Sequence, residues 1–339
     1  MRYIGLDVHK KNTTACVISA GGKVLKEMEV PSNADGLSAI RDYMGTNEYC
    51  VMMESSTYSY SVYRYFDDLG IEAHVVHARS LKVVTDSTKK TDKKDARTIG
   101  IMLRLWKKKE IDELKMSFIP TREQCELKDI CRYREEISVK LGDETRRIKS
   151  HMERNCQPLP YVFSDLNTRK AREYIRRTWP EDLTLQRRMN MFEEFLDERD
   201  SVAKNIGSRM PGDNSVGLLE KIVGIGRQTA VQIMSMIIDI DRFDDPEKMC
   251  AYFGMVPRMH DSGGKERRGR MTKEGDKMMR MIMERVTLTH IQWCDSAITR
   301  YYNRKLPEMG VKKALITASR KMLMVIHAVL KTQRPFRAA

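Results

Sequence analysis

The sequence predicts a mixed α/β domain at the amino end of the chain, followed by a part that is mostly helical. Residues 1–78 alternate short apolar strands with helical segments, whereas apolar residues from 121 onward recur at the three- and four-residue spacing of helices. The chain has 339 residues, which is enough for about two domains.

The amino-terminal stretch is expected to begin with a strand buried on both faces, because Tyr3, Ile4 and Leu6 carry aromatic and aliphatic bulk. Gly21 and Gly22 predict a hairpin turn between the second and third strands. The first expected strand lies within residues 1–10, and the others cover 12–18, 24–30, 49–53 and 71–76. The expected helices cover 33–44 and 58–69. This order predicts a mixed sheet with helices on its faces.

Carboxylates stand where two of these strands end, at Asp7 and Glu54. Burying a lone carboxylate costs several kcal/mol unless a charge or a metal compensates it. Taken singly, each could instead cap a loop or helix. Asp92 and Asp95 lie three residues apart, so a helix capped by Thr91 presents both on one face. Four acids within the first hundred residues favour a shared site over a solvated helix end.

Residues 121–156 predict a long charged helix with a capping box formed by Thr121 and Gln124, and a second helical stretch covers 183–208. Helices of this length are typical of a coiled-coil-like arm that dimerises or bridges nucleic acid. From this arm we expect contacts to the nucleic-acid backbone only. The expected domains are 1–110, 111–210 as the helical arm, and 211–339.

Residues 218–230 have the form helix, Gly-x-Gly turn, helix, which predicts a helix–hairpin–helix motif. Gly224 and Gly226 would let backbone N–H groups approach a phosphate, with Arg227 beside them. The alternative is two helices joined by a plain glycine turn. A dinucleotide-binding fold is excluded, because no strand precedes these glycines and the third glycine is missing.

Ser262 is followed by two glycines, which predicts a flexible loop that exposes a hydroxyl group. Such loops are common and usually structural, so the motif alone does not assign a function. Basic side chains close to it could bind the phosphate under attack and lower the serine pKa. These residues are Lys265, Arg267, Arg268 and Arg270.

The net charge of +14 and the pI near 9.4 predict a polyanionic partner, most commonly nucleic acid. No apolar run approaches the roughly 18 residues of a membrane-spanning helix, and no membrane partner is expected. The amino end lacks an apolar signal region. Seven cysteines without a Cys-x-x-Cys pair argue against a zinc ribbon or disulfide frame, so we expect reduced thiols in a cytoplasm.

Three motifs resemble those of DEDD-type insertion-sequence transposases, a family of serine-dependent recombinases guided by a bridge RNA. They are the stretch 5–10 around Asp7, Glu54 after its strand, and the stretch 90–96. The resemblance implies a RuvC/ribonuclease H-like amino-terminal domain, cleavage and rejoining of DNA, and a catalytic set of Asp7, Glu54, Asp92, Asp95 and Ser262.

The resemblance also implies that the four acids hold Mg²⁺, and oxygen ligands without Cys or His fit Mg²⁺ or Mn²⁺ better than zinc. The implied partners are donor and target DNA, a bridge RNA and further copies of the chain in a dimer or tetramer. The implied location is a prokaryotic cytoplasm, where the protein would associate with the nucleoid. Lys93 and Lys94 lie among the acids and are expected to contact nucleic acid.

Two other readings stay open at this point. A RuvC-like structure-specific nuclease would use the same acids with an activated water and no covalent intermediate. A non-catalytic nucleic-acid-binding protein would use the basic surface, with the acids as caps. An actin-like sugar kinase is disfavoured, because Val8-His9-Lys10 follows the first aspartate where that fold expects Gly with Thr or Ser.

Overall fold

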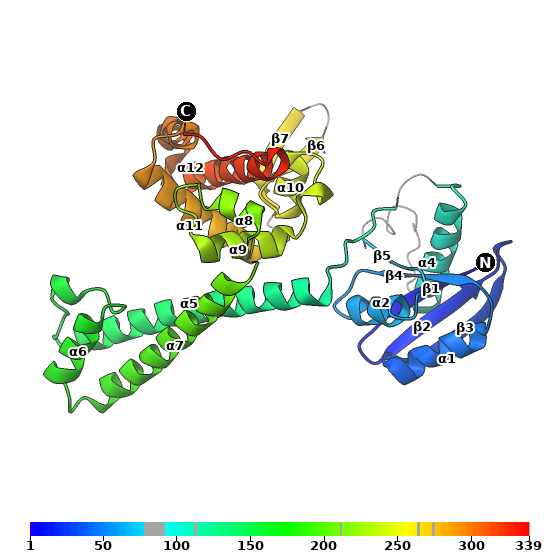
Figure 1. The fold of residues 1–339 in the computed structure, drawn as a ribbon, viewed down its shortest axis with the longest axis horizontal. Helices are drawn as coiled ribbons and strands as arrows, with labels where there is room; N and C mark the ends of the chain where they lie inside the picture. Colours follow the sequence, from blue (N-terminus) through cyan, green and yellow to red (C-terminus); the bar gives the residue numbers. More distant parts are fainter. Residues whose placement is uncertain (78–91, 112–113, 211, 263–264, 273–274, 339) are drawn as a thin grey trace. The chain divides into compact units, whose positions relative to one another are not determined.

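The computed structural model describes residues 1–77, 92–111, 114–210, 212–262, 265–272 and 275–338 (Figure 1). For residues 92–93, 258–262 and 265–271 it describes the backbone alone. The chain forms two compact units, Met1–Pro120 and Thr121–Ala339. The finer division into three domains stays a prediction.

The first unit contains a five-stranded sheet in the order β3-β2-β1-β4-β5. β1 pairs antiparallel with β2 and parallel with β4, so the mixed sheet predicted from the sequence is confirmed. Its strands are β1 Arg2–Val8, β2 Asn12–Ile18, β3 Val24–Pro31, β4 Tyr49–Glu54 and β5 Ala73–Val76, and its helices are α1 Ala34–Met44, α2 Ser59–Asp67 and α4 Asp92–Lys107.

Helices cover both faces of this sheet. Successive side chains of a strand point to opposite faces, so β1 contributes to the packing on both. From β1, Ile4 and Leu6 pack with Leu37 of α1 and Phe66 of α2 on one face. Tyr3 packs on the other face, in the cluster formed with α4. β1 is therefore central in the sheet and buried on both sides, as its composition predicts.

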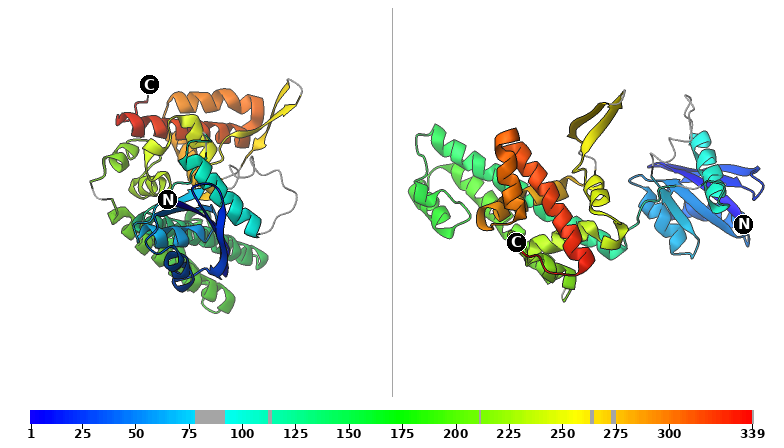
Figure 2. Two further views of the ribbon diagram at one scale, coloured as in Figure 1. Left: turned by 90° about the vertical axis from the view of Figure 1, so that its right-hand side faces the viewer. Right: turned by 90° about the horizontal axis from the view of Figure 1, so that it is seen from above.

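The second unit is mostly helical. Its α-helices are α5 Arg122–Arg154, α6 Arg169–Thr178, α7 Leu183–Ser208, α8 Asn214–Leu219, α9 Arg227–Ile237, α10 Pro246–Tyr252, α11 Lys277–Trp293 and α12 Ala297–Thr332; two short 3₁₀ turns are η1 Tyr161–Phe163 and η2 Ile240–Arg242. β6 Pro257–Ser262 and β7 Lys265–Met271 form an antiparallel pair. α5 and α7 lie along one another (Figures 1 and 2).

Two apolar clusters stabilise this unit. The carboxyl-terminal half of α5 packs with α6 and α7 through residues such as Ile148, Ile175 and Phe192. A larger cluster joins Cys131 of α5 and Ile206 of α7 to helices α8–α12. No helix within the described residues is long and apolar enough to cross a membrane.

Candidate active site and nucleic-acid interface

Asp7 and Glu54 lie at neighbouring ends of two parallel strands. The ladder between β1 and β4 pairs Leu6 with Met53, and the next residue on each strand is the carboxylate. Both side chains are partly buried, and the Asp7 side chain is only 14% exposed. The carboxyl ends of parallel strands are the edge at which open α/β sheets bind their ligands.

Gly5 lets helix α4 approach the backbone of β1. A Cβ atom at Gly5 would lie 2.0 Å from the carbonyl oxygen of Ala96 and 2.2 Å from the backbone nitrogen of Gly100. These separations are far shorter than a van der Waals contact, so only glycine fits at this position. The close approach fixes α4 against the strand that carries Asp7.

The direction of α4 follows from contacts at its carboxyl end. Lys107 forms an ion pair with Glu72, and the rings of Trp106 and His74 lie 4.9 Å apart. Glu72 immediately precedes β5, which runs parallel to β4, so α4 ends at the amino edge of the parallel strands. Its opposite end, Asp92–Asp95, therefore points toward the carboxyl edge, where Asp7 and Glu54 lie.

His9 was not singled out from the sequence, yet its Nε2 atom lies 3.2 Å from Oδ2 of Asp7. The imidazole is 56% exposed. Where side chains are described, no three His, Cys, Asp or Glu side chains are close enough together to hold a metal ion. The side chains of Asp92 and Lys93 lie outside the described residues. So do those of the basic residues predicted to contact nucleic acid that lie on β7.

Ser262 is the last residue of β6, and its Cα pairs with that of Lys265 on β7. The sequence predicted a loop here, so the expectation is corrected for Ser262; residues 263–264 lie outside the described residues. The strand was missed because Pro257–Met271 has few β-branched or aromatic residues and many charges. The cross-strand pairing of the backbone, which residue composition does not reveal, defines it.

The turn between α8 and α9 gives different roles to its two glycines. Gly224 has φ of 95°, and a Cβ there would lie 2.8 Å from the carbonyl oxygen of Val286 on α11. Gly226 is exposed, precedes the first turn of α9 and has open space around its Cα. Of the two, only Gly226 has no heavy atom within 4 Å of an added Cβ, and its contact with a phosphate stays a prediction.

Arg227 is held by the protein itself. It donates hydrogen bonds to the carbonyl oxygens of Met210 at 2.9 Å and Gly207 at 3.5 Å, and it lies 3.4 Å from Glu220. These contacts join the start of α9 to the end of α7. Its part in nucleic-acid binding stays a prediction.

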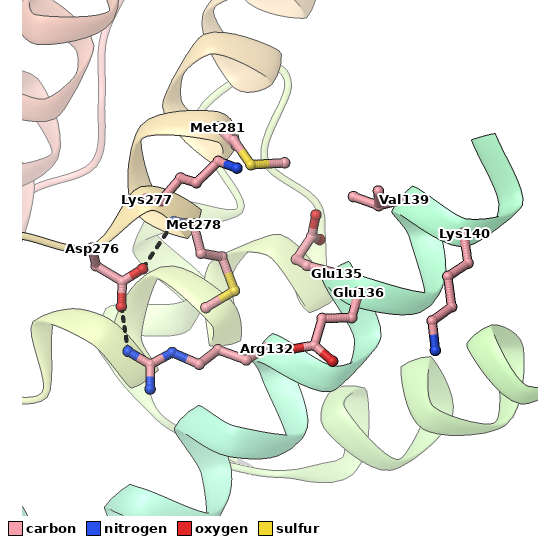
Figure 3. Close-up of a pocket in the computed structure, with 9 residues that line it drawn as sticks. All are labelled: Arg132, Glu135, Glu136, Val139, Lys140, Asp276, Lys277, Met278 and Met281. Atoms are coloured by element: carbon pink, nitrogen blue, oxygen red, sulfur yellow. Dashed lines mark hydrogen bonds and ion pairs between the residues drawn. The ribbon is translucent and has the colours of Figure 1, made fainter. Parts of the chain in front are cut away.

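A pocket of about 510 Å³ lies between α5 and the start of α11 (Figure 3). At one side, Arg132 donates to Asp276 at 2.8 Å, and Asp276 accepts the backbone N–H of Met278 at 2.9 Å. Burial acts to raise the pKa of the Asp276 carboxyl, but Arg132, the Met278 amide and Lys128 outweigh it and hold that pKa below its usual value.

Glu135, which also lines this pocket, is a buried carboxylate that the sequence did not reveal. It is 5% exposed and accepts two hydrogen bonds from Arg285, each of 3.1 Å, one from Gln232, also of 3.1 Å, and one from Arg134 at 2.8 Å. Burial acts to raise the pKa of Glu135, but the arginine contacts prevail and lower it. Within a helix as charged as α5, such a residue looks like part of a solvated face.

An α/β sheet with carboxylates at its ligand-binding edge, joined to a basic helical unit, is typical of enzymes that act on nucleic acids. Residues 4–156 match the DEDD transposase family of the IS110 type, and residues 216–303 match the Transposase IS116/IS110/IS902 family. The chain belongs to the DEDD-type insertion-sequence transposases and is a DNA transposase or recombinase.

Three curated relatives are similar to this chain. The transposase for insertion sequence element IS1111A of Coxiella burnetii is 23% identical over 99% of this chain and 92% of its own. The transposase for insertion sequence element IS1533 of Leptospira borgpetersenii is 24% identical over 70% of each chain. The pilin gene-inverting protein of Moraxella lacunata is 29% identical over 35% of this chain and 38% of its own.

Proposed function

We propose that this transposase cuts and rejoins DNA with a metal-binding tetrad of Asp7, Glu54, Asp92 and Asp95 and with Ser262 as the nucleophile. The observation that carries the proposal is the arrangement at one sheet edge. Two carboxylates occupy adjacent parallel strand ends, and the amino end of α4 is directed toward them.

The donor set at this edge fits a hard divalent cation. DEDD transposases typically depend on a divalent metal, and carboxylate oxygens favour Mg²⁺, with Mn²⁺ as an alternative. Two such ions stabilise the attacking and leaving oxygens of phosphoryl transfer. The partial burial of Asp7 limits its contact with water, and the amino end of α4 favours negative charge beside Asp95.

Ser262 would supply the attacking oxygen. Its Oγ forms a bond to phosphorus, the bond from phosphorus to the deoxyribose oxygen breaks, and the serine proton passes through a base to that leaving oxygen. The reverse step restores the hydroxyl and joins a new DNA end. The backbone of Lys265 pairs with that of Ser262 across the hairpin. A cationic group close to the serine would lower the cost of forming the alkoxide.

The acids belong to the first compact unit and Ser262 to the second, so catalysis requires a contribution from each. A homo-oligomer, dimeric or tetrameric, would hold several such sites on the DNA ends that are exchanged. The name of the Moraxella relative refers to the inversion of a gene, a reaction that also exchanges DNA ends.

A bridge RNA is the second proposed partner, in addition to donor and target DNA. The net charge of +14 supports binding of more than one nucleic acid. The exposed amino end of α9, Lys93, Lys94 and the basic residues of β7 are the proposed contacts with nucleic acid. Full recombination by protein freed of RNA by nuclease treatment would remove the RNA from this proposal.

The metal site is tested by single substitutions assayed for Mg²⁺-dependent DNA cleavage. Asp7→Asn and Glu54→Gln should each fold normally and reduce cleavage to the level seen with excess chelator. Asp42→Asn, an exposed acid of α1 with a 64% exposed side chain, is the matched control and should cleave as the unaltered protein does. Unchanged cleavage by both tetrad variants would rule out the site.

A further inference from the structure

We propose that a groove between α5 and α7 binds the phosphodiester backbone of a duplex nucleic acid. The groove has a volume of about 510 Å³. Its residues lie far along the sequence from the four acids of the proposed metal site and from Ser262. It is lined by Asp143, Arg146, Arg147, Ser150, Arg154 and Arg188.

Three of these residues form a row along α5. Arg146, Ser150 and Arg154 are spaced by four residues, so they share one face of the helix. At 1.5 Å per residue the row extends over about 12 Å. Duplex DNA carries one charge per about 1.7 Å of axis, so a row of this length faces several phosphates.

A buried carboxylate orients two further guanidinium groups. Glu144 is 1% exposed and accepts hydrogen bonds from Arg147 at 3.2 Å and from Arg188 at 2.7 Å. Arg147 belongs to α5 and Arg188 to α7, so the contact fixes the two walls of the groove to each other. Each arginine carries five N–H donors and gives one to Glu144, which leaves the others for a ligand.

The charge balance of the groove favours an anion. Arg146 forms an ion pair with Asp143, and Glu144 is shared by Arg147 and Arg188. The groove therefore holds four arginines against two carboxylates, and its net charge is positive. The side chains of Arg146 and Arg147 are 73% and 62% exposed. Guanidinium groups bind phosphate with paired hydrogen bonds, and Ser150 adds a hydroxyl donor.

The groove is also rigid enough to serve as a binding surface. Beneath it, Ile148 and Met152 of α5 pack against Leu185 and Met189 of α7, and all four are buried. The lining offers arginine, aspartate and serine side chains and no apolar side chain. A phosphate backbone therefore suits it better than an apolar protein segment.

The test is equilibrium binding of the full chain to a duplex of arbitrary sequence, measured by fluorescence anisotropy over a range of salt concentrations without divalent metal. The variant is Arg146→Gln with Arg154→Gln. Each lost phosphate contact should reduce the log–log salt slope on duplex DNA by about 0.9, so we expect a decrease of about 1.8.

The matched control is Arg169→Gln with Arg177→Gln, two exposed arginines of α6 that do not line the groove. It removes the same charge and should leave the slope close to that of the unaltered protein. An equal decrease in both double variants would reduce the effect to net charge and overturn the proposal. No decrease in either would overturn it as well.

Ser150→Glu supplies a second variant that keeps every arginine in place. It adds a negative charge inside the groove, so it should weaken binding, and unchanged affinity would contradict the proposal. Titrations of the groove variants with duplex DNA and with duplex RNA identify the source of the phosphates. It is the nucleic acid whose affinity for the variants falls. Because the measurement involves no cleavage, failure of the proposed catalytic site would leave its outcome unaffected.

Discussion

At the scale of single residues, Gly5 shows how the local sequence positions the candidate site. The absence of a side chain lets Ala96 and Gly100 of α4 lie against β1 two residues before Asp7. The acids themselves could be predicted from their places after apolar strands. The contact between Gly5 and α4 could not, because it joins residues more than ninety positions apart through their backbones.

Gly5→Ala should displace α4. The added methyl would meet the Ala96 carbonyl oxygen at 2.0 Å, a backbone atom that cannot rotate away. We expect a loss of about 3 kcal/mol in the free energy of unfolding, the upper part of the range for overpacked cores. Urea denaturation measures this loss.

Gly21→Ala is the control for Gly5→Ala, because the nearest atom to its added methyl is the Ser19 hydroxyl oxygen at 3.9 Å. It should change stability by less than about 0.5 kcal/mol, as surface substitutions usually do. Equal stability of the two variants would show that α4 does not depend on the glycine contact.

Glu135 carries a pH-dependent part of the stability. Its pKa is lowered in the folded chain, so its contribution is present at neutral pH and is lost as the pH falls below about 4.5 and through the folded-state pKa. Glu135→Gln should therefore cost about 3 kcal/mol at pH 7, because Arg285 and Arg134 lose their charged partner, and less at acid pH.

Thermal unfolding at pH 7 and pH 4 measures this difference. The neighbouring exposed acid supplies the control: Glu136→Gln makes the same charge change and should alter stability little at either pH. A cost for Glu135→Gln that stayed constant or increased toward pH 4 would contradict the assigned role of the ion pair.

At the scale of elements, the sequence predicted best those segments whose signals are local. Thr121 with Gln124 forms the capping box of α5, as expected. Ser32 and Asn33 were both plausible caps for α1 from the sequence, and Asn33 is the cap. Helix α6 was missed, because Arg169–Thr178 contains few apolar residues and is held by packing of Ala171 and Ile175 against α5 and α7. Long-range packing of this kind leaves little trace in a short stretch.

Thr121→Ala tests the start of α5. The substitution removes the hydroxyl that accepts the Gln124 N–H at 3.2 Å, which should cost about 1 kcal/mol. Ser138→Ala, in the middle of the same helix, should cost little or stabilise it, since the Ser138 hydroxyl only bonds the Arg134 carbonyl at 3.0 Å. Chemical denaturation distinguishes the two; equal losses would show that the cap is not the cause.

At the scale of the whole molecule, composition predicted the class of partner because the net charge of +14 does not depend on the fold. It could not predict where that charge gathers. The arginines of the α5–α7 groove come from positions 146–188 and are brought together by the packing of α5 against α7. The buried Glu144 that orients two of them looks like any other acid of a charged helix.

The charge also predicts how DNA affinity depends on ionic strength. Binding should weaken steadily as salt rises, with a log–log slope of about 0.9 for each phosphate contact on duplex DNA. Titrations at several salt concentrations measure this slope. An affinity that barely changes between low and moderate salt would show that backbone contacts do not dominate binding.

The central claim is that DNA strands are cut by a serine of this chain, and the most direct measurement is the detection of a covalent protein–DNA species. Labelled substrate DNA, incubated with the protein and its copurifying RNA in Mg²⁺, should comigrate with the protein on a denaturing gel. Ser262→Ala should bind DNA yet give no such band, whereas Ser201→Ala, at an exposed position of α7, should give it fully. A covalent band that persists in Ser262→Ala would contradict the account, because another side chain would then be the nucleophile. Cleavage without any covalent band would also contradict it and would favour a nuclease that uses water.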